Sequence, residues 1–279
     1  MAGVRIVTDS SCDLPQEVVD DLDIALVPLS IRFGDEELTD REELSAEAFY
    51  KRMAGFEGLP ETAAPSPGAF ETAFRAQAEA GADQVVCVNL SAALSATMVS
   101  AQNAAKAVDG DLDVSVVDSQ SITTGLGTLV ILAAEAAADG ASAEDVVALV
   151  ERTRTRIHVF GGLDTLENLK KGGRIGGAQA MLGTLLSIKP VIDISTGSVD
   201  ESGKVRTRRK QMLFLRDKLL AAGEVTHLNV CDGFAPDADE FAEVISEAVG
   251  HEAERGTIGP VIGTHGGPRV VGLSWLDPE

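Results

Sequence analysis

The chain alternates short apolar segments with longer helical ones, and this alternation constrains the fold more than any other feature. The segment QVVCVN at 84–89 is apolar almost throughout, as expected of a strand that is buried on both faces of a sheet. Three further segments have strand-like composition, at 4–8, 24–29 and 114–117. Helices are predicted around them, at 45–53, 69–80, 97–108, 127–138 and 142–156. This order predicts an α/β fold with a mostly parallel sheet and flanking helices.

Local signals predict how several of these elements begin. Asp13 is expected to cap a helix that opens near Pro15, and Ser45 is expected to cap the helix that follows it. The pair Gly34-Asp35 is expected to close a hairpin over 32–39. The segment GLPETAAPSPG at 58–68 is predicted to be a loop because it is rich in Gly and Pro.

The second half of the chain lacks the regular alternation of strand-like and helical segments. Strand-like segments lie at 158–163, 191–194, 203–206, 226–231, 257–262 and 270–275. Helical segments lie at 165–171, 211–222 and 237–249. We therefore predict two domains, an N-terminal α/β domain over 1–156 and a C-terminal α/β domain with a mixed sheet over 157–279.

A basic segment stands out at 166–210. It holds nine Lys and Arg but only four Asp and Glu, in a chain whose net charge is −21. Arg174 lies in its glycine-rich centre, KGGRIGG, where a planar guanidinium could bind a carboxylate or phosphate. A single acid elsewhere in the protein would explain Arg174 equally well. The cations at 206–210 could belong to a solvated strand end, and the apolar run at 181–188 could line a cavity or belong to the core.

Composition and missing motifs exclude several functions. The net charge of −21 argues against nonspecific nucleic-acid binding. The three cysteines are far apart and no Cys or His pair has zinc-ligand spacing, so neither a structural disulfide nor a metal is expected. The sequence contains no phosphate-binding loop, dinucleotide fingerprint, nucleophile elbow or kinase signature. We therefore expect no cofactor, and no phosphoryl or hydride transfer by the chain alone.

The sequence also predicts a cytoplasmic protein. Its first residues, MAGVRIVTDSS, lack a signal-peptide core. No segment approaches the roughly 18 uncharged apolar residues that a membrane-spanning helix needs.

Single polar side chains remain as candidates for ligand binding. Thr62 lies between prolines that would hold its hydroxyl in place, and Ser95 lies near a predicted helix start that follows a buried strand. His265 is followed by two glycines, which allow a ligand to come close. Turn formation, helix capping and an ordinary loop histidine are the respective structural alternatives.

Taken together, the motifs resemble those of the DegV family, over essentially the whole chain. The matching segments are IVTDSS at 6–11, VPLS at 27–30, Thr62 with PSP at 65–67, LSAT at 94–97, VDS at 117–119, Leu166 with GGRI at 172–175, IKP at 188–190, KVR at 204–206, and GTH at 263–265 with GP at 267–268. Each match is weak alone, but the ordered series is specific.

The resemblance implies a function as well as a fold. It implies two α/β domains with a long-chain fatty acid buried between or within them. It implies a carrier without catalysis of its own, which presents the fatty acid to a separate ATP-dependent kinase subunit for acyl-phosphate formation in phospholipid synthesis. Transient membrane contact, without stable insertion, would fit this role. By resemblance, Thr62 and Ser95 bind the carboxylate with His265 close by, and Arg174 and Arg206 lie at the pocket mouth, where phosphotransfer occurs.

The chain departs from the family pattern at three places, none of which removes a proposed ligand donor, and two rival functions stay open beside the carrier. The family commonly has Ser-Gln after the loop threonine and reads His-Thr-Gly-Pro-Gly near the C-terminus, whereas this chain has Ala63-Ala64 and the segment HGGPR at 265–269. It also commonly has Gly after the serine of the Leu-Ser pair, where this chain has Ala96. One rival is a stand-alone hydrolase or transferase that uses Ser95 and His265 on a carboxylate or phosphate ligand. The other is a binding or regulatory protein whose acidic surface docks a partner.

Overall fold

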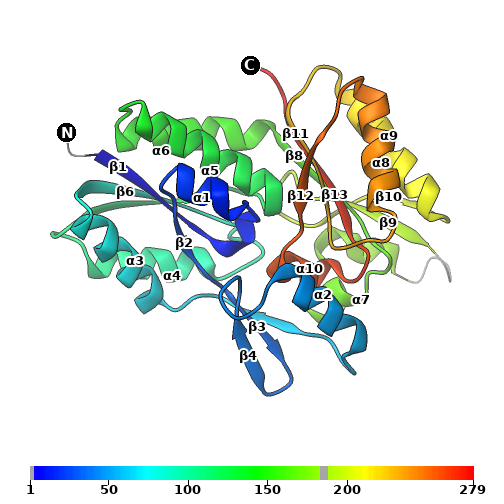
Figure 1. The fold of residues 1–279 in the computed structure, drawn as a ribbon, viewed down its shortest axis with the longest axis horizontal. Helices are drawn as coiled ribbons and strands as arrows, with labels where there is room; N and C mark the ends of the chain where they lie inside the picture. Colours follow the sequence, from blue (N-terminus) through cyan, green and yellow to red (C-terminus); the bar gives the residue numbers. More distant parts are fainter. Residues whose placement is uncertain (1–2, 183–187) are drawn as a thin grey trace.

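The computed structural model describes residues 3–182 and 188–279, and its first sheet is parallel throughout (Figure 1). The strand order is β2-β1-β6-β7, with bounds β1 Gly3–Asp9, β2 Ala25–Val27, β6 Ala82–Asn89 and β7 Asp113–Asp118. Helices α5 (Thr123–Ala138) and α6 (Ala143–Thr153) cover one face, and α3 (Pro67–Glu79) and α4 (Thr97–Ala107) cover the other. The predicted doubly covered parallel sheet is confirmed.

Strand β6 shows why its sequence is continuously apolar. Val85 and Cys87 belong to the core beneath α3 and α4, whereas Val86 and Val88 belong to the core beneath α5. Successive side chains of a strand point to opposite faces, so burial on both sides requires an apolar residue at every position.

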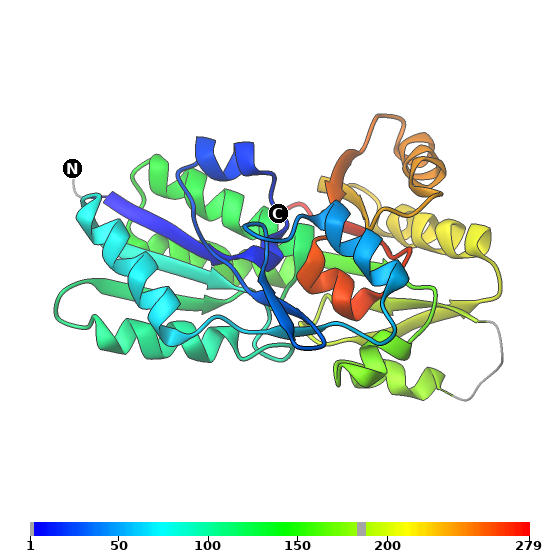
Figure 2. The same ribbon diagram turned by 60° about the horizontal axis from the view of Figure 1, so that its bottom comes forward.

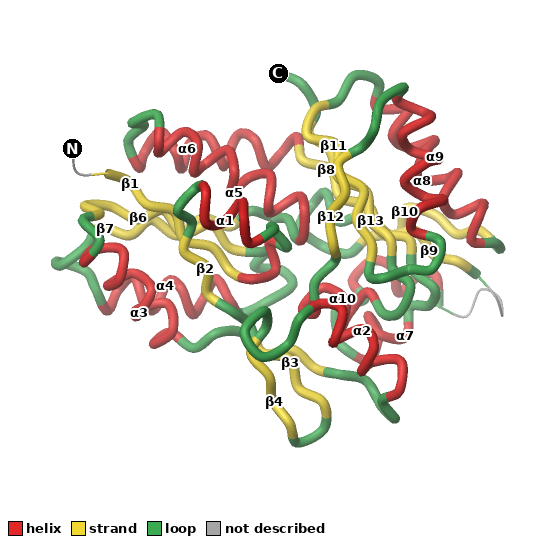
Figure 3. The backbone as a smooth tube through the Cα atoms, viewed as in Figure 1, coloured by secondary structure: helices red, strands yellow, loops and turns green. Residues whose placement is uncertain are grey.

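The second large sheet is mixed and has the order β10-β9-β8-β13-β11-β12. Its strands are β8 Ile157–Gly162, β9 Lys189–Asp193, β10 Asp200–Val205, β11 Thr226–Asp232, β12 Glu254–Thr257 and β13 Val271–Leu276. Helices α8 (Arg208–Ala222) and α9 (Ala238–Val249) lie against one face (Figure 3). The other face is turned toward the N-terminal half, where α5 packs on it. The expected mixed sheet is therefore present.

A small antiparallel sheet and several short helices fill the space between the two large sheets (Figure 2). The small sheet has the order β4-β3-β5, with β3 Ser30–Phe33, β4 Glu36–Thr39 and β5 Glu61–Ala63. The short α-helices are α1 Gln16–Asp21, α2 Ala46–Gly55, α7 Glu167–Lys171 and α10 Pro260–Gly266. Three 3₁₀ turns complete the fold, η1 Ser10–Cys12, η2 Arg154–Arg156 and η3 Gly176–Met181. The four-stranded sheet is built from residues before 157, and the six-stranded sheet is built from residue 157 onward. The largest apolar cluster, by contrast, contains residues from both parts of the chain.

Helix α5 lies between the two large sheets because glycines let it approach its neighbours. A Cβ atom on Gly125 would come within 2.4 Å of Val159 on β8. A Cβ atom on Gly127 would come within 2.8 Å of the carbonyl oxygen of Cys12 on η1. Side chains at these positions would force the helix away from β8 and η1, so Gly125 sets how closely α5 approaches the second sheet and Gly127 how closely it approaches η1.

Four local predictions are wrong. Asp13 does not cap α1; it has a left-handed backbone with a φ of 53° and ends η1. Part of the predicted loop at 58–68 is strand β5, which pairs with β3. The apolar segment predicted as a strand at 257–262 instead begins α10, because Pro260 sets the helical φ angle at the first position. The cations at 208–210 form the first turn of α8, capped by the Thr207 hydroxyl, rather than a strand end.

Candidate functional site

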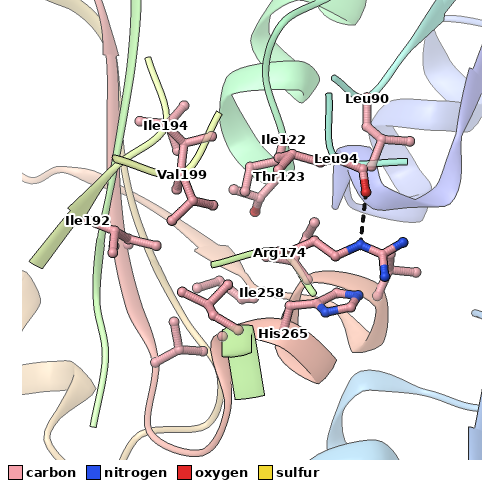
Figure 4. A pocket seen from close by; sticks show the side chains of 18 of the residues that line it. Leu90, Leu94, Ile122, Thr123, Arg174, Ile192, Ile194, Val199, Ile258 and His265 are labelled. Carbon is pink, nitrogen blue, oxygen red and sulfur yellow. Dashed lines mark hydrogen bonds between the residues drawn. The ribbon is translucent and has the colours of Figure 1, made fainter. Parts of the chain in front are cut away.

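An apolar cavity lies between the two halves of the chain (Figure 4). The space open to a water-sized molecule inside it is about 80 Å³, and the total space between its atoms is about 770 Å³ when its open side is included. The N-terminal half contributes Leu29, Leu90, Leu94, Ile122 and Thr123, and the C-terminal half contributes Val159, Leu163, Ile192, Ile194, Val199, Ile258 and Val261 among others. These residues come from many separate segments, so the cavity exists only in the folded chain.

Polar side chains gather at one side of this cavity. Thr62, Ser95, Arg174 and His265 all line it, although they are far apart in the sequence. Figure 4 shows Arg174 and His265 across the cavity from Ile192, Ile194 and Val199. The cavity therefore has a polar end and an apolar end, which is the shape of a site for an amphiphile with a polar head.

Thr62 and His265 are joined across the two halves by a hydrogen bond. Thr62 Oγ1 lies 2.9 Å from His265 Nε2. The position of Thr62 is fixed by β5, in which it pairs with Ile31 of β3. His265 lies on α10, and a Cβ atom on Gly172 would come within 2.6 Å of its Nδ1. Glycine at 172 therefore makes room for the imidazole.

The imidazole of His265 is neutral at pH 7. Burial lowers its pKa to about 4, and the nearby positive charge of Arg174 adds to the effect. A neutral imidazole can donate a hydrogen bond from one ring nitrogen and accept one at the other.

Ser95 and Arg174 are held by their own local contacts. Ser95 Oγ lies 2.9 Å from Thr97 Oγ1 and accepts a hydrogen bond from the Thr97 N–H at the start of α4. Arg174 donates from Nε to the Leu94 carbonyl at 3.1 Å and from a terminal nitrogen to the Gly172 carbonyl at 2.6 Å. Arg174 thus ties the glycine-rich turn to the segment that carries Ser95.

Thr62, Arg174 and His265 also form a wall of a polar groove on the outside of the cavity. Lys171, Glu61 and Thr264 line this outer groove with them. The three side chains therefore separate an apolar interior from a polar surface, so a polar group bound to them is next to the outer groove.

Arg206 does not line the apolar cavity. It is exposed, and it lines a separate basin together with Lys170, Lys189 and the apolar side chains of Leu182 and Ile188. Of the apolar run at 181–188, Met181 is buried, and residues 183–187 lie outside the described residues. The walls of the cavity come instead from apolar residues that carry no local sequence motif, such as Ile122 and Val199.

The geometry gives Ser95 no general base. Its hydroxyl contacts Thr97, whereas the imidazole of His265 contacts Thr62, and the described part of the chain shows no hydrogen bond between Ser95 and His265. A serine nucleophile needs such a contact for its activation. Among the residues that the structure describes, no group of three or more His, Cys, Asp and Glu is placed to hold a metal ion. Within residues 3–182 and 188–279, no helix combines the length and the apolar character needed to cross a membrane.

The lowered pKa of His265 predicts a pH dependence of stability. The unfolded chain binds a proton to His265 below about pH 6.5, but the folded chain does so only near pH 4. Its contribution to the free energy of unfolding is therefore present above pH 6.5 and is lost as the pH falls through this window, by about 3 kcal/mol in total and by about 2 kcal/mol at pH 5. Urea unfolding at pH 7 and pH 5 should show that His265→Gln loses less stability than the wild type on acidification. An equal loss of stability in the two proteins would contradict a lowered pKa of His265.

Comparison with known proteins gives consistent matches over almost the whole chain. A family model described as "Uncharacterised protein, DegV family" matches residues 3–277. A DegV domain-containing protein of Listeria innocua is 34% identical over 277 residues, covering 98% of each chain. A structure described for the fatty acid binding of a DegV family protein from Thermus thermophilus has 32% identity and a TM-score of 0.90, covering 99% of this chain and 100% of that one. A stearic acid-binding protein from Eubacterium ventriosum has 27% identity and a TM-score of 0.90, covering 99% and 98%.

Proposed function

This chain belongs to the DegV family, and from that membership we propose that it binds a long-chain fatty acid in the cavity between its two halves. The observation that carries the proposal is the cavity itself, which is apolar along most of its wall, with Thr62, Ser95, Arg174 and His265 gathered at one side. Solved relatives whose descriptions name fatty acid or stearic acid binding share the fold and support the same ligand class.

Burial of the acyl chain supplies most of the binding energy. Each buried CH₂ contributes about 0.8 kcal/mol, so a chain of about 16 carbons contributes roughly 12 kcal/mol before the costs of association. The polar groups therefore need mainly to orient the carboxylate and to replace its hydrogen bonds to water.

The polar end can supply those hydrogen bonds. If His265 Nε2 carries the proton, it donates to Thr62 Oγ1 across their 2.9 Å contact and leaves the Thr62 hydroxyl free to donate to the carboxylate. The Ser95 hydroxyl provides a second donor, and the guanidinium of Arg174 adds positive charge nearby. This arrangement favours a carboxylate over a neutral head group.

A binding experiment tests carboxylate recognition directly. Delipidated protein should bind stearate at least tenfold more tightly than octadecanol, which has the same chain length but a neutral head, since hydrogen bonds to a charged group contribute about 1.5–3 kcal/mol. Displacement of a fluorescent fatty acid would measure both affinities. Equal affinities, or no binding of either ligand, would count against the proposal.

The second part of the proposal is that the chain carries the acid to a separate ATP-dependent kinase, which forms the acyl-phosphate. Two features support it. The sequence has no motif for ATP, and Thr62, Arg174 and His265 form part of the wall of the outer groove, where a partner could reach the head group. Arg174, and Arg206 in the neighbouring basin, are the proposed contacts for the phosphoryl group or the partner. The chain alone is not expected to catalyse the reaction.

Arg174→Ala should separate the two parts of this function. We expect acyl-phosphate formation to fall more than tenfold, because the loss of a charge-assisted contact costs about 1.5–3 kcal/mol, while stearate affinity changes by less. Acyl-phosphate can be trapped with hydroxylamine after incubation with ATP and a fatty acid kinase. Arg209→Ala is a matched control, because Arg209 is exposed and pairs with Glu240 on α9 among the residues that the structure describes. Equal losses of binding and phosphorylation in Arg174→Ala would contradict the division of roles.

A further inference from the structure

Asp13 is a largely buried acid beside the cavity that the proposed function does not use. It ends η1 with a φ of 53°, an uncommon angle for a residue other than glycine. Its carboxyl faces the backbone of Gly259, where a Cβ atom would come within 2.4 Å of Asp13 Oδ1. The Gly259 N–H and the Thr123 hydroxyl lie beside the carboxyl, and within the described residues Thr123 Oγ1 has no hydrogen-bond partner of ordinary geometry. Glycine at 259 is therefore what allows this approach.

The neighbours of Asp13 are parts of the cavity wall. Thr123 lines the cavity and begins α5, with a φ of 46° that is rare for a β-branched residue. Gly259 immediately precedes α10, which carries His265 together with the lining residues Val261 and Ile262. One carboxyl thus contacts the starts of both helices that shape the polar end.

Asp13 has no cation to balance a charge. Within residues 3–182 and 188–279 it forms no ion pair, and Oδ2 has no hydrogen bond of ordinary geometry. Arg41 is near enough to act on it electrostatically, but its guanidinium is bound to the Leu14 carbonyl and to Gln16. Burial raises the pKa of Asp13 to about 8, so the group is a neutral acid at pH 7.

Other ionisable groups around Asp13 do not titrate in the same range. These are Asp40, whose pKa burial raises to about 6, Cys12 and Cys231, whose pKa values burial raises to about 12, and Tyr50, whose pKa lies well above its ordinary value. Between pH 7 and pH 9, Asp13 is therefore the group of this cluster that gains a charge.

We propose that Asp13 is a positioning residue for the polar end of the cavity, because its carboxylic acid holds the start of α10 against η1 and so sets where His265 meets Thr62. Ionisation places an unpaired charge at this junction, and such a charge is stabilised by solvation. The junction then opens toward water, and α10 shifts with the imidazole that it carries. The inference rests on the proposed function only in the experiment that measures stearate affinity.

The test compares the pH dependence of stearate affinity in three full-length proteins. If binding needs neutral Asp13, the dissociation constant of the delipidated wild type should rise about tenfold between pH 7 and pH 9. Asp13→Asn keeps the shape, one donor and one acceptor but cannot ionise, so its rise should be less than threefold. Asp40→Asn removes a second buried acid that does not line the cavity; its dissociation constant should also rise, but from a lower pH, because the negative charge of Asp40 raises the pKa of Asp13. An Asp13→Asn protein with the wild-type pH profile would overturn the proposal.

A measurement without ligand separates this inference from the proposed function. The NMR signal of the His265 ring in ligand-free wild type should shift with a midpoint near the pKa of Asp13, about 8. This measurement uses the wild-type protein, so it does not depend on whether a variant folds. The shift together with a failure to bind stearate would sustain the role of Asp13 and reject the fatty-acid function. A His265 signal that stays constant from pH 7 to pH 9 would overturn the role of Asp13.

Discussion

Replacement of Val199 by tryptophan should lower the affinity of the delipidated protein for stearate by about 50–100-fold. Val199 is buried in the cavity wall, across from Arg174 and His265 (Figure 4). An indole there would occupy the space of about three methylenes, each worth about 0.8 kcal/mol of burial, and about 1.4 kcal/mol corresponds to a tenfold change in affinity. Displacement titration with a fluorescent fatty acid would measure the change.

Chain length provides the internal control for the Val199 variant. Dodecanoate is shorter and should lose less affinity than stearate, because its chain ends before the blocked region. Val99→Trp makes the same substitution at an exposed position on α4 and should leave both affinities unchanged. Thermal unfolding would show that the Val199 variant is folded. Equal losses for the two acids would argue that the acyl chain does not extend toward Val199.

The double variant Thr62→Val and Ser95→Ala should lose stearate affinity by at least 100-fold. Both hydroxyls line the polar end of the cavity, and each hydrogen bond to a charged carboxylate contributes about 1.5–3 kcal/mol. Octadecanol should be much less affected, since it lacks the charged head. The same displacement titration applies.

A matched control removes a hydroxyl that has only a local role. Thr72→Val deletes a hydroxyl on α3 that bonds the Gly68 carbonyl and does not line the cavity. Its stearate affinity should equal that of the wild type. If the double variant lost stearate and octadecanol affinity in the same proportion, the two hydroxyls would be acting on packing rather than on the carboxylate.

The sequence was most informative where local chemistry and burial agreed. Ser45 caps α2 as predicted, and Ser142 caps α6 in the same way, with each hydroxyl accepting from the backbone N–H three residues on. The continuous apolar run of β6 identified a strand that is buried on both faces. In each case the signal lies within a few residues, so no tertiary information is needed.

The errors came from segments whose structure depends on distant partners. Strand β5 is short and lies among prolines, and it exists because β3 offers a pairing edge. The segment at 257–262 is apolar enough for a strand, but the chain turns at Gly259-Pro260, where the Asp13 carboxyl adjoins the backbone. Arg208 begins a helix, and its guanidinium binds both carboxylate oxygens of Asp237 at 3.0 Å. None of these partners can be read from the local sequence.

The candidate site likewise has a part that the sequence predicts and a part that it does not. Thr62, Ser95, Arg174 and His265 stand out in the sequence beside turns, glycines and helix starts, and the structure brings them to one cavity. The apolar wall could not be predicted, because residues such as Ile122, Ile194 and Val199 resemble any other core residue until the two sheets face each other. Arg206 directly follows strand β10 and lines a separate basin. The sequence alone does not show that β10 runs toward this basin and not toward the cavity.

Native mass spectrometry of bacterially produced protein would show directly whether the cavity between the two halves holds a long-chain fatty acid. We expect a species heavier than the chain by one carboxylic acid of roughly 14–18 carbons, because burial of about 0.8 kcal/mol per CH₂ should retain the acid through purification. Extraction with organic solvent should release the same acid, in about one copy per chain. A protein that is purified free of lipid and does not take up stearate after delipidation would contradict the claim.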